Sequence, residues 1–91
     1  MRADKCKRVT ALLGQCCSPL RLGILCILSA GDRTIKELAE LSGAKVNNVS
    51  QHLKMMELGG LISKQRRGQF VVCSLKDERI SKLIGCLEKY F

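Results

Sequence analysis

The sequence predicts a mainly α-helical domain with a single β-hairpin, in the order of four helices, two strands and a final helix. Three observations carry this prediction. Apolar residues recur at helical spacing in five segments, and one further segment alternates as strands do. Proline or glycine separates these segments. We find no internal repeat and no linker, so residues 1–91 form one domain.

The first two helices lie on either side of Pro19. Before it, Val9, Leu12 and Cys16 recur at helical spacing and predict an amphipathic helix. Proline suits the first turn of a helix, because its missing N–H would be unpaired there anyway. Residues 20–28, LRLGILCIL, are apolar on nearly all sides, so we expect the second helix to be buried.

The third and fourth helices are short and are joined at Ser42-Gly43. Thr34 and Glu37 match the capping box, in which each side chain bonds the other residue's backbone N–H at the helix start. The fourth helix is predicted from about Lys45 to Leu58. These two helices are expected to bury the apolar residues Ile35, Leu38, Ala39, Leu41, Val46, Val49, Leu53 and Met56.

The hairpin and the last helix complete the chain. Residues 61–75, LISKQRRGQFVVCSL, alternate on both sides of Arg67-Gly68 and predict two strands with a cationic tip. Residues 77–91, DERISKLIGCLEKYF, form an amphipathic helix. Its predicted apolar stripe is Ile80, Leu83, Ile84, Leu87, Tyr90 and Phe91.

The third and fourth helices together have the pattern of a helix-turn-helix, and the hairpin that follows is placed as a wing. Amide side chains on the outer face of the fourth helix can bond an adenine edge in two places. Cations on the wing can reach phosphates or the minor groove. His52 is expected either to support its helix, to bind a phosphate or to read a base. The predicted DNA-contacting residues are Asn47, Asn48, Ser50, Gln51, His52, Lys54, Lys64, Arg66, Arg67 and Gln69.

The charge of the chain favours a polyanionic partner, and double-stranded DNA is the expected one. Lysine and arginine number 16 against 8 aspartates and glutamates, which gives a net charge of +8. Residues 1–30 hold five basic and one acidic residue and residues 61–91 hold seven and three, whereas the middle third is balanced. The basic first helix and wing are therefore expected to supply salt-dependent affinity.

The sequence gives little support to other classes of function. A single histidine, no acidic pair beside it and no glycine-rich phosphate loop argue against an enzyme, and no cofactor is expected. The start, MRADKCKRVT, lacks the apolar core of a secretory signal, and no run is long enough to span a membrane. We expect a cytoplasmic protein, in which cysteines stay reduced. A winged helix that binds another protein is the alternative to a DNA-binding one.

These motifs resemble the ArsR/SmtB family of small, dimeric winged-helix repressors over about residues 9–91. The matching stretches are SPLRLGILCILSAGDRTIKELAELSG, VSQHLKMMELGGLI, whose Val49–Leu53 follows the V-S-x-H-L pattern, and RRGQFVVCSL. The chain departs from the pattern at Lys45 and Val46, where the family often has a polar cap and Gln. The resemblance implies a homodimer joined by the first and last helices. It also implies that the fourth helix enters the major groove of a palindromic operator.

The resemblance also suggests how the protein is controlled. Cys26 matches the second-helix cysteine of the persulfide- and redox-responsive, BigR- and HlyU-like members. Their second cysteine lies near the end of the last helix, at a place that falls just beyond Phe91 here. Cys86, about a turn and a half earlier, is the nearest thiol to that place. A sulfur-based inducer acting on Cys26 and Cys86 is therefore the first hypothesis.

Two other interpretations of the cysteines remain open. Cys16 and Cys17 are adjacent, and a pair of thiolates could bind trivalent arsenic or another soft metal ion as inducer. Metal sensors of the family commonly use Asp and His on the last helix, where only Asp77 remains here, or cysteines in the third helix, which has none. Free cysteine is also among the most buried residue types, so packing without sensing is the third interpretation, favoured for Cys16 and Cys73.

Overall fold

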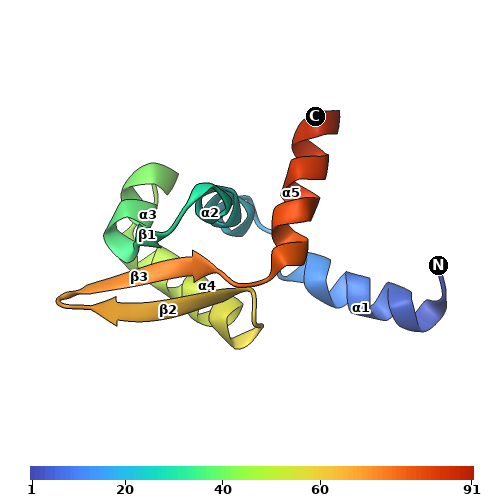
Figure 1. The fold of residues 1–91 in the computed structure, drawn as a ribbon, viewed down its shortest axis with the longest axis horizontal. Coiled ribbons are helices and arrows are strands. Elements are labelled where there is room, and N and C mark those ends of the chain that lie inside the picture. Colours follow the sequence, from blue (N-terminus) through green and yellow to red (C-terminus); the bar gives the residue numbers. More distant parts are fainter.

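The computed structural model describes residues 1–91 and contains every predicted element in the predicted order, plus one short additional strand (Figure 1). The mainly helical fold with a β-hairpin wing is therefore confirmed. The elements are α1 (Ala3–Gly14), α2 (Pro19–Ala30), β1 (Arg33–Thr34), α3 (Ile35–Ser42), α4 (Val46–Leu58), β2 (Ile62–Arg67), β3 (Phe70–Leu75) and α5 (Glu78–Tyr90).

The additional strand β1 turns the hairpin into a three-stranded antiparallel sheet of order β1-β3-β2. Arg33 pairs with Cys73, so the wing is attached to the segment that leads into α3. Two residues are too short to show an alternating pattern, which is why the sequence does not predict β1. At the other end of the hairpin Arg67 pairs with Phe70, and Gly68 takes the left-handed conformation that the tight turn requires, with φ +63°.

The ends of the central helices are fixed by the residues predicted from the sequence. Pro19 is the first residue of α2, and the Ser18 side chain accepts a hydrogen bond from the Arg21 backbone N–H at 3.3 Å. At α3 the backbone N–H of Thr34 donates to Glu37 Oε1 at 2.9 Å, and the Glu37 N–H donates to Thr34 Oγ1 at 3.1 Å. Those two bonds complete the capping box. Hydrogen bonds to the Glu37 carboxyl, first from the Thr34 backbone N–H and then from the Thr34 side chain, hold its pKa below its usual range. The caps set where the helix-turn-helix begins.

The hydrophobic core lies where α2, α3 and α4 meet the sheet and the first half of α5. Thirteen residues are buried, all of them apolar or cysteine. Twelve of them lie in α2, α3, α4, β2, β3 and α5, and the thirteenth, Leu61, lies just before β2. Neither α1 nor β1 contributes a buried residue. The buried residues are Ile24, Leu25, Leu28, Leu38, Ala39, Val49, Leu53, Met56, Leu61, Ile62, Cys73, Ile80 and Ile84.

Several expected core positions are exposed, and these predictions were wrong. Leu41 is 59% exposed, because it lies at the edge of the α3 stripe formed by Leu38 and Ala39. Val46 is 49% exposed, because it opens α4 before that helix reaches the core. The second helix is not buried on all sides either: it buries only Ile24, Leu25 and Leu28.

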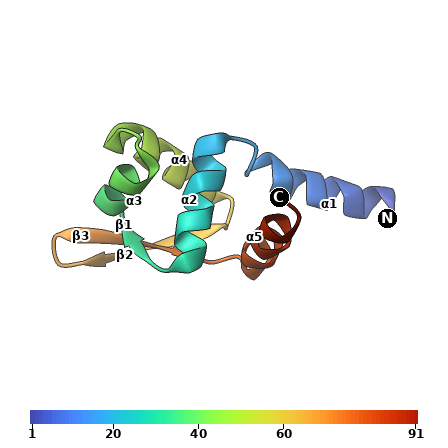
Figure 2. The same cartoon turned by 90° about the horizontal axis from the view of Figure 1, so that it is seen from above.

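Two parts of the molecule project from the core. Helix α1 buries no residue, and it extends along the long axis away from the hairpin (Figures 1 and 2). Only Leu12 and, just beyond the helix, Cys16 pack against the core. The last turns of α5 also stand free, with Leu87, Tyr90 and Phe91 exposed although their stripe is apolar. Most of α1 and the last turns of α5 therefore lack a partner within the chain.

By length and hydropathy, no single helix qualifies to cross a membrane. Helices α1 and α2 reach that threshold only when taken together, and they meet at a 90° bend.

Candidate nucleic-acid interface

Helix α4 presents a polar face opposite its buried stripe. Val49, Leu53 and Met56 are buried, which turns the side chains about half a turn away from them toward solvent. The exposed side chains are Asn47, Asn48, Gln51, Lys54 and Met55. None of the four polar ones bonds another group of the chain, so their donors and acceptors are free for a ligand. The structure thus brings the predicted amides together on one face.

The turn before α4 leaves the start of this helix open. Gly43 ends α3 in the left-handed conformation, with φ +73°, and lets the chain reverse direction within a few residues. Lys45 is the N-cap of α4, and its side chain makes no capping bond. The first N–H groups of α4 therefore have no side-chain acceptor, and the positive end of the helix dipole can face an anion such as a phosphate.

Ser50 and His52 lie half-buried on the two flanks of this polar face. The Arg21 side chain, from the first turn of α2, donates a hydrogen bond from Nε to His52 Nδ1 at 2.9 Å. His52 therefore supports α4 through α2, which is one of the roles expected for it. The sequence analysis did not single out Arg21, because its partner lies 31 residues away along the chain.

The cations of the wing lie at different distances from the tip of the hairpin. Arg66, Arg67 and Gln69 are exposed near the tip, and Arg67 Nη2 donates to Gln65 Oε1 at 3.3 Å. Lys64 lies lower on the hairpin, half-buried, and its Nζ is 3.6 Å from Glu57 Oε1 at the end of α4. Lys64 thus ties the wing to α4, while Arg66 and Arg67 form the cationic tip.

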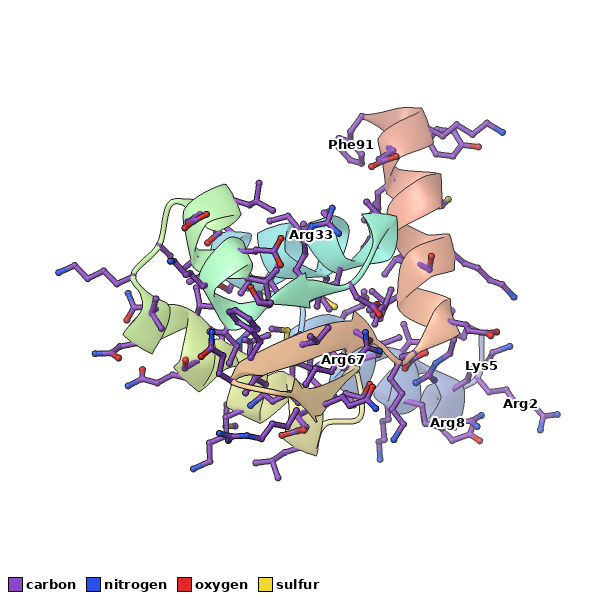
Figure 3. All side chains as sticks on the ribbon, turned by 60° about the vertical axis from the view of Figure 1, so that its left-hand side comes forward. Arg2, Lys5, Arg8, Arg33, Arg67 and Phe91 are labelled. Atoms are coloured by element: carbon purple, nitrogen blue, oxygen red, sulfur yellow. The ribbon has the colours of Figure 1, made fainter.

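A second basic region lies at the other end of the molecule. Arg2, Lys5 and Arg8 gather along α1, far along the long axis from the hairpin tip (Figures 1 and 3). Lys5 and Arg8 line a shallow groove with Arg79 of α5. Within one chain, the basic first helix and the basic wing therefore do not form one continuous surface.

The two cysteines expected to act as sensors are separated within the chain. Cys26 is half-buried in α2 and packs against the core. Burial raises the pKa of its thiol, and the Glu88 carboxylate raises it further. Cys86 is exposed on α5, two residues before Glu88 and hence about 200° around the helix from it. Cys86 therefore does not lie on the side of α5 that carries Glu88, nor on the side that buries Ile80 and Ile84.

The other cysteines differ in exposure. Cys73 is fully buried in the sheet, where burial raises the pKa of its thiol, as expected for a packing role. Cys16 is half-buried with its thiol 3.5 Å from the Leu12 carbonyl oxygen, and its pKa is raised by burial and then by Cys17 and Asp77. Cys17 is exposed. No group of three or more potential metal-binding side chains exists in the chain.

The remaining acid considered for a last-helix metal site has a structural role. Asp77 caps α5 by accepting the Arg79 backbone N–H at 3.0 Å, and it also binds the Arg79 guanidinium through both carboxylate oxygens. These bonds hold the pKa of Asp77 below its usual range. Its carboxylate oxygens are thus already engaged.

A polar recognition helix in a helix-turn-helix, beside a wing with a cationic tip, defines a winged helix-turn-helix transcriptional regulator. The family model of the bacterial regulatory proteins of the arsR family matches residues 18–64. The chain therefore belongs to the ArsR family, which confirms the resemblance seen in its motifs.

Individual proteins that the chain resembles support this family assignment. The HTH-type transcriptional regulator YgaV of Escherichia coli K12 is 36% identical over 86 residues, which cover 93% of this chain and 87% of the relative. The structure of HlyU from Vibrio cholerae superposes with a TM-score of 0.87 at 26% identity and covers 100% of this chain and 98% of that one. The repressor BigR from Xylella fastidiosa has the same fold, with a TM-score of 0.92 at 24% identity over 97% and 90% of the two chains. The family and these relatives are regulators rather than enzymes, as expected.

Proposed function

We propose that this chain is a homodimeric repressor that binds a palindromic operator in the cytoplasm and is released when a sulfur species modifies Cys26. The observation that carries the DNA-binding part is the free polar face of α4 beside the wing. Asn47, Asn48 and Gln51 supply neutral donors and acceptors for base edges. Lys54, Arg66 and Arg67 supply charge for phosphates.

The unpartnered helices support the dimer. Helix α1 buries no residue in this chain, and an amphipathic helix of 12 residues is at best marginally stable alone. Beside α5, the residues Leu22, Leu87 and Phe91 line an open apolar groove of about 550 Å³. A second copy would cover both surfaces and place two α4 helices on one side of the DNA, roughly 34 Å apart.

The position of Cys26 supports the thiol part. Cys26 lies in α2 and packs against the core, and the Glu88 carboxylate of α5 is near enough to raise the pKa of its thiol. A larger side chain at this position would therefore disturb the packing of α2. In the proposed reaction the Cys26 thiolate attacks the outer sulfur of a low-molecular-weight persulfide, RSSH. The old S–S bond breaks, RS⁻ leaves and takes a proton, and Cys26 carries one extra sulfur.

Cys86 can complete the reaction only if α5 moves. Its thiolate would attack the Cys26 sulfur, form a disulfide and release HS⁻. Because Cys86 lies about 200° around α5 from Glu88, that step requires rotation of α5, which removes Ile80 and Ile84 from the core. Movement of α5 changes the dimer geometry, and this couples the thiol to the spacing of the two α4 helices.

The proposal is tested by selecting a duplex from random sequences with the reduced protein, then repeating the binding titration after treatment with a persulfide, an oxidant or arsenite. We expect a palindromic selected site and release of the DNA on persulfide treatment. Intact mass should show one added sulfur, or the loss of two hydrogens if a disulfide forms, and a Cys26→Ser variant should not respond.

The other arms of this titration separate the alternatives. Release by arsenite alone, lost in a Cys16→Ser/Cys17→Ser variant, would assign control to the adjacent pair. Binding of DNA with no response to any agent would remove the sensor from the proposal. Failure to select any duplex would leave a winged helix that binds protein rather than DNA.

A further inference from the structure

We infer that Arg21 and His52 form a phosphate-binding pair at the edge of the recognition helix. The inference rests on the proposed DNA-binding function, and it adds a residue of α2 to the interface. Its starting point is the hydrogen bond of 2.9 Å from Arg21 Nε to His52 Nδ1. Figure 2 shows the first turn of α2 beside α4, whereas its last turn leads into β1.

The bond fixes which nitrogen of His52 faces outward as a donor. A neutral imidazole has one N–H and one acceptor nitrogen. Because Nδ1 accepts the Arg21 hydrogen, Nε2 carries the ring hydrogen. Nε2 makes no hydrogen bond within the chain and is not among its buried unpaired polar atoms, so it is open to solvent.

Arg21 has unused donors of its own. Only Nε bonds a side chain, and neither terminal nitrogen has a partner or is buried without one. No carboxylate lies within ion-pair distance, since the chain's two ion pairs join Lys64 to Glu57 and Arg79 to Asp77. A half-buried, uncompensated guanidinium therefore sits beside the face of α4 that is free for DNA.

Together these donors suit one kind of ligand, a phosphate of the DNA backbone. The terminal nitrogens of Arg21 and Nε2–H of His52 offer a charged fork and a neutral donor, which suit the oxygens of a phosphate diester. His52 lies on the flank of α4 rather than at the centre of its polar face, where a helix in the major groove passes the DNA backbone. The pair thus positions the helix on the backbone and reads no base.

The test compares Arg21→Gln, Arg21→Lys and His52→Gln with the unchanged protein on the selected duplex and on a random duplex of the same length. Arg21→Gln should weaken both complexes about tenfold and make the dependence of log K on log salt shallower by about one for each subunit. Arg21→Lys should restore the slope but only part of the affinity, because it keeps the charge and lacks the Nε donor.

Two further measurements isolate the pair. The Arg21→Gln/His52→Gln double variant should lose less than the sum of the single losses. In phosphate-ethylation interference, ethylation of one phosphate per half-site should weaken binding of the unchanged protein but not of Arg21→Gln. Arg33→Gln is the matched control, because Arg33 is also half-buried but follows the other end of α2. Thermal unfolding of each variant shows whether it is folded at the temperature of the titration.

Normal affinity and salt slope in Arg21→Gln, with an unchanged ethylation pattern, would overturn the pair while leaving the DNA-binding function intact. An equal effect of Arg33→Gln would also overturn it, because the loss would then reflect net charge alone. If the unchanged protein binds neither duplex, the proposed function itself fails.

Discussion

At the residue scale, burial and the Glu88 carboxylate together raise the pKa of the Cys26 thiol. A thiol reacts as its thiolate, so a raised pKa slows its reactions at neutral pH. Burial is the larger cause of the raised pKa and the Glu88 carboxylate the smaller one. At neutral pH the Cys26 thiol should therefore react more slowly than an exposed, unperturbed thiol, whatever the electrophile.

We therefore predict an order of alkylation by iodoacetamide, followed by peptide mass spectrometry. The exposed Cys6, Cys17 and Cys86 should react first, Cys26 more slowly, and the buried Cys73 only on unfolding. The rate at Cys26 should rise with pH up to its raised pKa. Glu88→Gln should speed Cys26 labelling at neutral pH and leave Cys17 unchanged. A Cys26 that reacts as fast as Cys17 in the unchanged protein would refute this assignment.

Residue roles that depend on contacts between helices could not be predicted from the sequence. The spacing of Asn47, Asn48 and Gln51 places them on one helix face, and they are exposed there. The effect of Glu88 on Cys26 and the bond from Arg21 to His52 join different helices, and no local pattern reports such pairs. The orientation of Cys86 depends on which face of α5 packs against α2, and the apolar stripe alone leaves that choice open.

At the element scale, the turn between α3 and α4 determines how α4 is presented. Gly43 has φ +73°, and no atom lies within 4 Å of the place that a Cβ would take, so a side chain there costs backbone energy without a clash. Gly43→Ala should lower the free energy of unfolding by about 1–2 kcal/mol, the cost of a left-handed alanine. Gly23→Ala, inside α2 with open space around it, should instead stabilise the protein by about 0.5–1 kcal/mol. Urea denaturation of both variants tests this, and equal effects would contradict the turn assignment.

The start of α5 gives a second prediction at this scale. Asp77 caps α5, so Asp77→Ala should cost about 1 kcal/mol at neutral pH, and Asp77→Asn should cost less because it keeps a capping oxygen. The folded pKa of Asp77 lies below its ordinary value of 3.8. Its contribution is therefore present above 3.8 and disappears as pH falls through the lower folded pKa. Unfolding curves should show a larger deficit of the Ala variant at neutral pH than at a pH well below 3.8, where a protonated Asp77 keeps a capping oxygen but loses its charge.

The sequence predicted where helices and strands begin and end better than it predicted which of their residues are buried. Pro19, the capping box and the glycines mark real ends of helices, because caps and turns act locally. Strand β1 was missed because a strand of two residues exists only through its pairing with β3. Leu41 and Val46 were assigned to the core because periodicity gives the direction of a side chain and not how far the neighbouring element extends.

At the scale of the whole molecule, the proposed dimer rests on α1, which buries no residue, and on the end of α5, where Leu87 and Phe91 are exposed. We predict that the protein is a dimer in sedimentation equilibrium and that Leu13→Glu/Leu87→Glu shifts it to the monomer. These side chains are 43% and 37% exposed, so the change leaves the core of one subunit intact. Leu41→Glu is the control, because Leu41 is more exposed still but belongs to α3, which lies on the opposite side of the molecule from α1 (Figure 1). A monomeric unchanged protein would contradict the proposed assembly.

The arrangement of charge also belongs to this scale. The sequence shows a basic start and a basic C-terminal third, but their separation appears only in the fold. The hairpin tip and α1 lie at opposite ends of the long axis (Figure 1), so one subunit offers the wing beside α4 and keeps the cations of α1 apart. Removing the wing cations should therefore reduce the salt dependence of DNA binding, while the cations of α1 stay unaffected.

The most direct test of DNA binding by α4 and the wing is a salt titration of Arg66→Ala/Arg67→Ala on the selected duplex. A duplex of about 30 base pairs holds two half-sites one helical turn apart. The double variant should bind more weakly, with a salt slope shallower by about two for each subunit. Lys82→Ala/Lys89→Ala, which removes the same charge from α5, should keep the normal slope. If Arg66→Ala/Arg67→Ala leaves both affinity and slope unchanged, the wing does not contact DNA and the proposed interface is wrong.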